Sequence, residues 1–495
     1  MFFQAAPSES GGPESRLFAN NGRRCHWFRH VFLVVLIASG GAVIGTKAED
    51  ISAAVSEADS LNQKGTELYR QGKYSEALPF AERALAIREK ALGPEHPDTA
   101  FSLNELAMLY RSMRNYAKAE PYFKRAVAIS EKALGPEHRH TAAYLGNLAF
   151  LYDSVGDYSK AEPLYQRALA IREKVLGPEH PDTSISINNL AHLYSLMGDY
   201  SKAERLYQHA LAINEKTLGS EHPGVAITLN NLAVLYSSMD DYAKAEPLLQ
   251  RALAIWEKSR GPEHPDTAAG LNNLADLYSS MGDYAKAEPR FQRALAIWEK
   301  SRGPEHPDTA SGLNNLANLY SSMGDYAKAE PFSRRALAIR EKTLGSEHPD
   351  TASSLNTLAQ LYGSMHDYAK AETLCQRALA IDEKVLGPEH PVTADSVSHL
   401  AFLYSVKGDY ATAESLLQRA LAIDEKVLGP EHTKTSRVLG LLADLYGSMG
   451  NYAKAEMYCK RALAIDEKTL GSQHPDTTLI RGDLAWIYHR LLSIA

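Results

Sequence analysis

The sequence predicts an all-α protein, a right-handed superhelical solenoid of ten antiparallel helix pairs followed by a C-terminal capping helix. Two series of tyrosines recur every 42 residues, apolar residues between them follow helical spacing, and a polar loop separates successive units. One such hairpin cannot bury both of its apolar stripes alone, so the units must stack in an elongated array. The two series are Tyr110, Tyr152, Tyr194, Tyr236, Tyr278, Tyr320, Tyr362, Tyr404, Tyr446, Tyr488 and Tyr74, Tyr116, Tyr158, Tyr200, Tyr242, Tyr284, Tyr326, Tyr368, Tyr410, Tyr452.

The first helix of each unit carries its apolar residues on one stripe. Leu103, Leu106 and Tyr110 follow one another at three- and four-residue steps, which places them on the same helix face. A polar turn then ends this helix at Asn115, where most later units have Asp. Asn and Asp side chains accept a backbone N–H at helix starts, so we expect this position to cap the second helix.

The second helix has its own stripe, which includes Ala119, Phe123 and Ala126. Gly135 and the proline after it supply the stop signal, and a loop with the pattern Gly-Pro-Glu-His-Pro-Asp leads to the next unit. Proline inside a helix removes a backbone hydrogen bond, so we expect a slight kink or a later helix start at these positions. The prolines concerned are Pro121, Pro163, Pro247, Pro289 and Pro331.

The chain divides into an N-terminal segment (1–48), a short linker (49–56), ten repeats (57–474) and a C-terminal capping helix (475–495). Arginines precede an apolar run at 31–44, and small residues follow it, which is the order of a secretory signal. We expect cleavage after Ala48, with an uncleaved membrane anchor as the alternative. Either version exports the body to the periplasm or the extracellular side, whereas a mis-annotated start would leave it cytoplasmic.

Composition excludes one class of partner. Without residues 1–48, which hold five Lys/Arg and two Asp/Glu, the chain has 48 basic and 58 acidic side chains, a net charge of −10. Nonspecific nucleic-acid binding rests on clustered basic residues, so DNA and RNA are not expected partners. Cys375 and Cys459 occupy the same repeat position as Phe123, so we interpret them as small buried hydrophobes.

The repeat resembles the tetratricopeptide repeat, through the series Leu103, Leu106, Ala107, Tyr110 and Tyr116 and the residues that follow. The 42-residue period, with Leu-Asn-Asn-Leu-Ala-x-Leu-Tyr at 271–278 and Gly-Pro-Glu-His-Pro-Asp-Thr-Ala at 261–268, is similar to the longer repeat of kinesin light chains and nephrocystin-like proteins. The resemblance covers residues 57–495. It implies a protein-binding scaffold without catalytic activity and without a cofactor.

The resemblance also implies that the first helices line a concave groove for a partner protein or an extended peptide. An amide donates and accepts at once, which suits a peptide backbone. We assign the groove to an asparagine row on the first helices, and the alternative is that the amides tie neighbouring first helices together. The asparagine row is Asn104, Asn188, Asn230, Asn272, Asn314 and Asn356, and a second asparagine row is Asn147, Asn189, Asn231, Asn273 and Asn315.

A third row on the first helices differs in almost every unit, and we expect binding specificity to lie there. Phe150, Phe402 and Trp486 are its best candidate anchors for a partner. Serines follow at the position where the resemblance implies a basic clamp for acidic peptide tails, so carboxylate recognition is not expected. This variable row is Met108, Phe150, His192, Val234, Asp276, Asn318, Gln360, Phe402, Asp444 and Trp486.

Ten histidines, from His96 to His474, recur in the loops between repeats, each two residues before a helix position that is usually Asp. A metal or acid–base site is one interpretation of this motif. Equivalent atoms of stacked units lie on the order of 10 Å apart, too far for shared ligation, so we expect these histidines to stabilise the loops. We expect no metal site and no catalytic residue.

Three functions follow as hypotheses. The leading one is a scaffold that binds protein partners along the groove. The second is a structural protein that self-assembles end to end, because Leu491, Leu492 and Ile494 leave apolar residues on the last helix. The third is a regulatory subunit of a separately encoded enzyme, which the sequence does not distinguish from the first.

Overall fold

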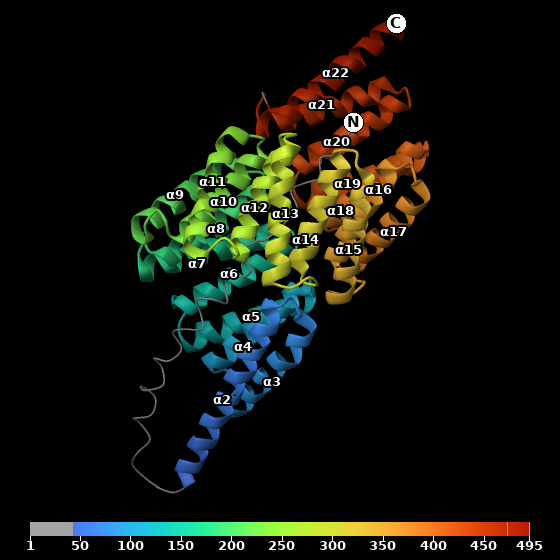
Figure 1. Cartoon of the computed structure of the whole chain (residues 1–495). Coiled ribbons are helices and arrows are strands. Elements are labelled where there is room, and N and C mark those ends of the chain that lie inside the picture. Colours follow the sequence, from blue (N-terminus) through green and yellow to red (C-terminus); the bar gives the residue numbers. More distant parts are fainter. Residues whose placement is uncertain (1–42, 473, 495) are drawn as a thin grey trace. The chain divides into compact units, whose positions relative to one another are not determined.

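The computed structural model describes residues 43–472 and 474–494, and every element in this part of the chain is a helix (Figure 1). The helices are α2 Val43–Arg70, α3 Tyr74–Leu92, α4 Pro97–Ser112, α5 Tyr116–Ala133, α6 Arg139–Ser154, α7 Tyr158–Leu176, α8 Pro181–Leu196, α9 Tyr200–Leu218, α10 Pro223–Ser238, α11 Tyr242–Arg260, α12 Pro265–Ser280, α13 Tyr284–Ser301, α14 Pro307–Ser322, α15 Tyr326–Thr343, α16 Pro349–Ser364, α17 Tyr368–Val385, α18 Pro391–Lys407, α19 Tyr410–Val427, α20 Thr433–Ser448, α21 Tyr452–Thr469 and α22 Pro475–Ile494.

Each even-numbered helix from α2 to α20 is the first helix of a repeat, and the next odd-numbered helix is the second. Inside each of the two units described below, contacts are most extensive within these pairs and next most extensive between successive pairs. The predicted all-α solenoid of ten helix pairs, with α22 as a capping helix, is confirmed. The chain forms two compact units, and the boundary between them falls between Leu151 and Tyr152, inside α6.

The predicted caps of the second helices are confirmed. Asn115 Oδ1 accepts a hydrogen bond from Lys118 N at 3.3 Å, and Asp157 Oδ1 accepts one from Lys160 N at 3.2 Å. Helix α5 therefore begins at Tyr116, five residues before Pro121. The expectation of a later helix start was wrong, because the cap holds the first turn ahead of the proline.

The histidine of each loop caps the following first helix. His180 Nδ1 accepts a hydrogen bond from Asp182 N at 3.0 Å, and His264 Nδ1 accepts one from Asp266 N at 3.1 Å. A proline occupies the first position of both helices, where no backbone N–H is needed. The expected loop-stabilising role of these histidines is confirmed.

Small residues allow the helices to approach closely. In the core around α12 and α13, Ala268 and Ala294 pack with Leu271 and Trp298. A side chain placed on Gly312 would lie 2.9 Å from Trp298 Cζ3, so glycine leaves room for the indole of the preceding helix.

Both cysteines of the repeats are buried and free, as interpreted from the sequence. Burial raises the pKa of Cys375 and that of Cys459 to about 12. The thiolate is the reactive form of cysteine, so both thiols are held in the unreactive form.

Within residues 152–494, loops contact first helices more than five repeats earlier in the chain. His432 Nε2 donates a hydrogen bond to Leu196 O at 2.8 Å, and His390 Nε2 lies 3.4 Å from Ser154 O. Each of these pairs is separated by 236 residues. This unit therefore coils into a superhelix whose successive turns touch each other. Nothing in the sequence indicated this contact between turns of the superhelix.

Residues 49–56, expected as a linker, lie inside α2 and are helical. The alanines at 53, 54 and 58 are strong helix formers, so the first repeat begins with a long helix. The predicted signal or anchor (1–48) lies almost wholly outside the described residues and stays a prediction. Among the residues that are described, none of the helices is both long and apolar enough to cross a membrane.

Candidate functional site

The first helices of successive repeats lie next to one another on one side of the unit at 152–494. Each of α8, α10, α12, α14, α16 and α18 contacts the following first helix, in addition to its own partner helix. Second helices of successive repeats contact each other less. The first helices therefore form the inner side of the curve, which is where the sequence analysis expects a ligand.

The asparagine row ties these first helices together. Asn272 Oδ1 accepts a hydrogen bond from Asn315 Nδ2 at 2.8 Å, and Asn230 Oδ1 accepts one from Asn273 Nδ2 at 2.8 Å. The same tie in residues 43–151 joins Asn147 Nδ2 to Asn104 Oδ1 at 2.8 Å. The alternative interpretation of the sequence, a structural role for the amides, therefore has direct support.

The other members of the asparagine row reach the next first helix through a hydroxyl. Asn314 Nδ2 donates to Ser354 Oγ at 3.0 Å, and Asn356 Nδ2 donates to Ser396 Oγ at 2.8 Å. Asn188 Nδ2 donates to Thr228 Oγ1 at 3.2 Å. A direct bond between these amides and a peptide stays a prediction, because each is already engaged in the frame of the solenoid.

Burial also limits the access of a ligand to the asparagine row. Asn104, Asn272 and Asn314 are buried, whereas Asn188, Asn230 and Asn356 are half-buried.

The variable row is more open than the asparagine row. Val234, Phe402 and Trp486 are 38%, 41% and 47% exposed, and Asp444 is exposed as well. In the same unit the remaining members, from His192 to Gln360, are half-buried. Each first helix thus presents one side chain that differs from its neighbours, in a frame held by the asparagines.

The three candidate anchors have different surroundings. In residues 43–151, Arg111 lies over the ring of half-buried Phe150, with its guanidinium carbon 4.2 Å from the ring centre. Trp486 on α22 contacts the ring of Tyr452 edge to face at 5.8 Å. Phe402 and Trp486 expose the larger apolar surfaces. These two lie in the unit at 152–494, whereas Phe150 belongs to the other unit.

Asp276 is the acidic member near the middle of the variable row. Its Oδ2 accepts a hydrogen bond from Asn272 Nδ2 at 2.9 Å. Burial raises the pKa of Asp276 to about 8, although this hydrogen bond opposes the shift. The carboxyl group is therefore largely protonated at neutral pH, and it can donate a hydrogen bond as well as accept one.

A charged cluster on α18 and α20 was missed by the sequence analysis. Asp395 accepts hydrogen bonds from Lys434 Nζ at 2.9 Å and from Arg437 at 2.7 Å. Burial opposes ionisation of Asp395, but the two cations outweigh it and lower its pKa to about 2. Lys434 stands where most units have Asp, and Asp395 and Arg437 are the charged residues at a repeat position that is apolar or Ser in the other units. Searching for departures from the consensus would have found them.

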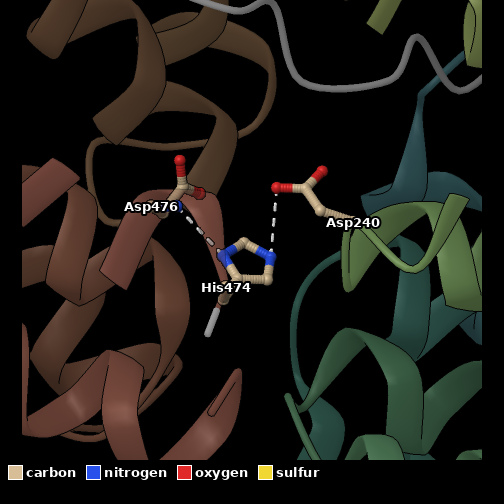
Figure 2. A group of neighbouring side chains, drawn as sticks. All are labelled: Asp240, His474 and Asp476. Carbon is tan, nitrogen blue, oxygen red and sulfur yellow. Dashed lines mark hydrogen bonds and ion pairs between the residues drawn. The ribbon is translucent and has the colours of Figure 1, made fainter. Parts of the chain in front are cut away.

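One group of side chains has the composition of a metal site. Atoms of Asp240, His474 and Asp476 lie within 4.8 Å of one another (Figure 2). His474 Nδ1 accepts a hydrogen bond from Asp476 N at 3.2 Å, so the proton of the neutral ring is on Nε2. Nε2 carries that proton and lies 3.1 Å from Asp240 Oδ2, within ion-pair distance, so the neutral ring has no nitrogen lone pair left for a metal. The group is better described as a contact between turns.

Comparison with known proteins gives one family. A model of the tetratricopeptide repeat matches residues 56–132, 103–174, 155–216, 186–258, 224–300, 266–342, 308–384, 350–405, 393–466 and 442–492. No curated protein matches the chain.

Several solved structures are similar. BtubC (BKLC) from P. vanneervenii is 30% identical, covers 47% of this chain and 92% of its own, and has a TM-score of 0.39. A putative kinesin light chain of Podosopora anserina with nearly identical TPR-like repeats is 32% identical, covers 42% of this chain and 98% of its own, and has a TM-score of 0.36. A variant of that protein with one substitution is also 32% identical, with 41% and 97% coverage and a TM-score of 0.37.

The family matches extend over residues 56–492 and agree with the helix pairs of the structure. The tyrosine period of 42 residues is the period of the longer repeat type. This chain therefore belongs to the tetratricopeptide repeat family, with repeats of the kinesin-light-chain-like type, and is a protein-interaction scaffold.

Proposed function

We propose that the unit at 152–494 binds an extended segment of a partner protein along the variable row, without catalysing a reaction. The observation that carries this proposal is the contrast between two rows on the same helices. The asparagines repeat and tie the helices together, whereas the variable row is more exposed and changes from unit to unit. A side chain that the frame does not need is free to select a partner.

The chemistry of the row suggests the kind of segment that it accepts. His192, Asp276, Asn318 and Gln360 are polar, half-buried and able to form hydrogen bonds with a peptide backbone. Phe402 follows as an exposed apolar residue. We infer a segment that is polar over most of its length and carries an apolar side chain for the Phe402 end.

A photo-reactive amino acid at Gln360 is the direct test. We expect it to crosslink a partner in an extract of the native host, because Gln360 lies in the middle of the row. The matched control places the same group at Met457, which is 55% exposed on the second helix α21. Capture of the same proteins at both positions would contradict the proposal.

A quantitative test uses the partner once it is identified. The combined variant His192→Ala, Gln360→Ala and Phe402→Ala is expected to weaken binding by about tenfold or more, since two or three contacts of ~1 kcal/mol are removed. The control variant Arg205→Ala, Thr373→Ala and Met457→Ala removes exposed side chains at one repeat position of the second helices. Equal weakening by both variants would place the binding site elsewhere.

We also propose that the body of the protein works outside the cytoplasm. The arginines before residues 31–44, the apolar run itself and the small residues after it support export. The N-terminal sequence of the protein isolated from its host is the test, and we expect it to begin at Glu49. A cytoplasmic protein that retains Met1 would contradict export.

A further inference from the structure

The contacts between turns of the unit at 152–494 use one edge of the solenoid, formed by the last turn of each first helix and the residues after it. Three members of this edge are covered by loops of later repeats, and we call them the covered ridge. Five later members form the open ridge. The covered ridge is residues 154–156, 196–198 and 238–240, and the open ridge is residues 280–282, 322–324, 364–366, 406–408 and 448–450.

The covered ridge receives the histidine and the following residue of each loop. His432 Nε2 bonds to Leu196 O at 2.8 Å, and a side chain on Gly198 would lie 3.4 Å from the same imidazole. A side chain on Gly156 would lie 3.1 Å from Pro391 Cδ. Glycine at this position therefore lets a loop lie directly on the backbone of the ridge.

Asp240 is the exception, because the covered ridge has glycine at its other two equivalent positions. Its φ of 50° lies in the left-handed region, which is unfavourable for an L residue. Its carboxylate lies within ion-pair distance of the loop histidine, with Oδ2 3.1 Å from His474 Nε2 (Figure 2). Loop and ridge are thus matched at three successive repeats.

The open ridge has the same structure without a covering loop among the described residues. Gly282, Gly324 and Gly450 have open space where Gly156 and Gly198 meet a loop. Methionines precede these three glycines and His366 at the same repeat position, and the methionines of the open ridge are the more exposed. Met281, Met323, Met365 and Met449 are 43%, 42%, 39% and 42% exposed, whereas Met197 and Met239 of the covered ridge are half-buried.

We propose that the open ridge binds the interrepeat loops of a second copy of this chain. The surface that fits such a ridge is present in the chain itself, because loops with the same His-Pro sequence cover the ridge one turn earlier. The loops at His180, His222 and His264 have this sequence, and their histidines are half-buried or exposed. Loops and ridge share the 42-residue period, so several contacts form at once and reinforce one another.

This head-to-tail association would continue the contact between turns from one copy to the next. Such a heterologous contact uses two different surfaces of each copy and leads to open chains of molecules. It does not depend on the proposed partner binding, because the variable row and the open ridge occupy different positions on the first helices.

Sedimentation equilibrium of the full chain over a wide concentration range is the test. We expect the wild-type mass to rise with concentration. The variant Met281→Glu, Met323→Glu and Met365→Glu places charges on the open ridge and is expected to weaken association by roughly tenfold or more, because several linked contacts are lost together. The control Met457→Glu changes a methionine of a second helix that is more exposed, at 55%, and it is expected to associate like the wild type.

The loop surface is tested by His180→Asn, His222→Asn and His264→Asn. Asparagine retains the helix cap, but its side chain is too short to reach the open ridge of a second copy as an imidazole does. Association is therefore again expected to weaken. Circular dichroism checks that each variant is folded. A wild-type mass that stays at one chain would overturn the proposal, as would equal loss in Met457→Glu. The proposal would also be overturned if Phe402→Ala lost association while the methionine variant associated normally. That result would place the contact on the inner face.

Discussion

Single residues of this chain fall into two groups, those that repeat and those that break the repeat. The repeated asparagines and histidines serve the frame, since their hydrogen bonds join neighbouring helices or cap them. Two carboxyl groups at positions where most units have another residue type have opposite pKa shifts. Asp276 is kept protonated by burial, and Asp395 is kept ionised by Lys434 and Arg437.

The pKa of Asp276 gives a prediction about pH. Between the ordinary value of 3.8 and about 8, the folded chain holds a proton on this carboxyl group that the unfolded chain has lost. The free energy of unfolding therefore decreases as pH rises through this range. We expect Asp276→Asn to be more stable than the wild type near pH 8 and to differ little below pH 4. Thermal unfolding at several pH values checks this, and a difference between the two proteins that stays constant with pH would contradict it.

Two glycines of the first helices give opposite predictions. In Gly312→Ala the added methyl group would lie 2.9 Å from Trp298 Cζ3, and the overpacking should lower the free energy of unfolding by about 1–3 kcal/mol. A methyl group added at Gly363 would point into open space. Gly363→Ala should therefore raise the free energy of unfolding by about 0.5–1 kcal/mol. Urea denaturation of both variants is the measurement. Stabilisation by Gly312→Ala would show that the indole is free to move away.

Each helix of the repeat carries its own start signal, which makes its boundaries a local property. The tyrosine that begins each second helix from α5 to α21 follows an Asn or Asp cap, and the first helices from α4 to α22 follow a histidine cap, whereas α3 follows Lys73 without a side-chain cap. These caps were predictable for the second helices, because Asn and Asp are the preferred residues there. For the first helices the sequence predicted only that the histidine stabilises the loop. It did not predict the cap itself, since an imidazole nitrogen accepts a backbone N–H only in one tautomer.

Asn451 tests the contribution of a single cap. Its Oδ1 accepts a hydrogen bond from Lys454 N at 3.3 Å at the start of α21. We expect Asn451→Ala to lower the free energy of unfolding by about 1 kcal/mol, while Asn451→Asp keeps it close to the wild-type value. Urea denaturation followed by circular dichroism measures both. Equal losses would mean that the amide acts through another contact.

Beyond single helices, the unit at 152–494 depends on contacts between distant repeats. His432 joins two roles, because Nδ1 caps α20 by accepting from Lys434 N at 3.1 Å and Nε2 reaches Leu196 O at 2.8 Å. Burial lowers the pKa of His432, so the neutral ring that both contacts use persists below the ordinary pKa of histidine. The contribution of His432 to the free energy of unfolding is therefore expected to be lost only as pH falls from 6.5 toward the lowered pKa.

His432→Asn separates the two roles of this histidine. The amide keeps a cap for α20 but does not reach the earlier turn, so the contact between turns should lose about 1 kcal/mol. Hydrogen exchange at residues 196–200 is expected to become faster, with little change in α20 itself. Unchanged exchange at 196–200 would mean that the hydrogen bond does not hold the turns together.

The amino-acid sequence determined the helices, their pairing and most of their caps, because a 42-residue period repeats local signals that act within a few residues. It also located the asparagine and variable rows. Tertiary structure decided what these rows do: Asn272 and Asn315 bond to each other, which leaves the variable row as the more open surface. It also decided that His432 meets Leu196, 236 residues away. Small rotations between stacked repeats add up over five repeats, and no local pattern records their sum.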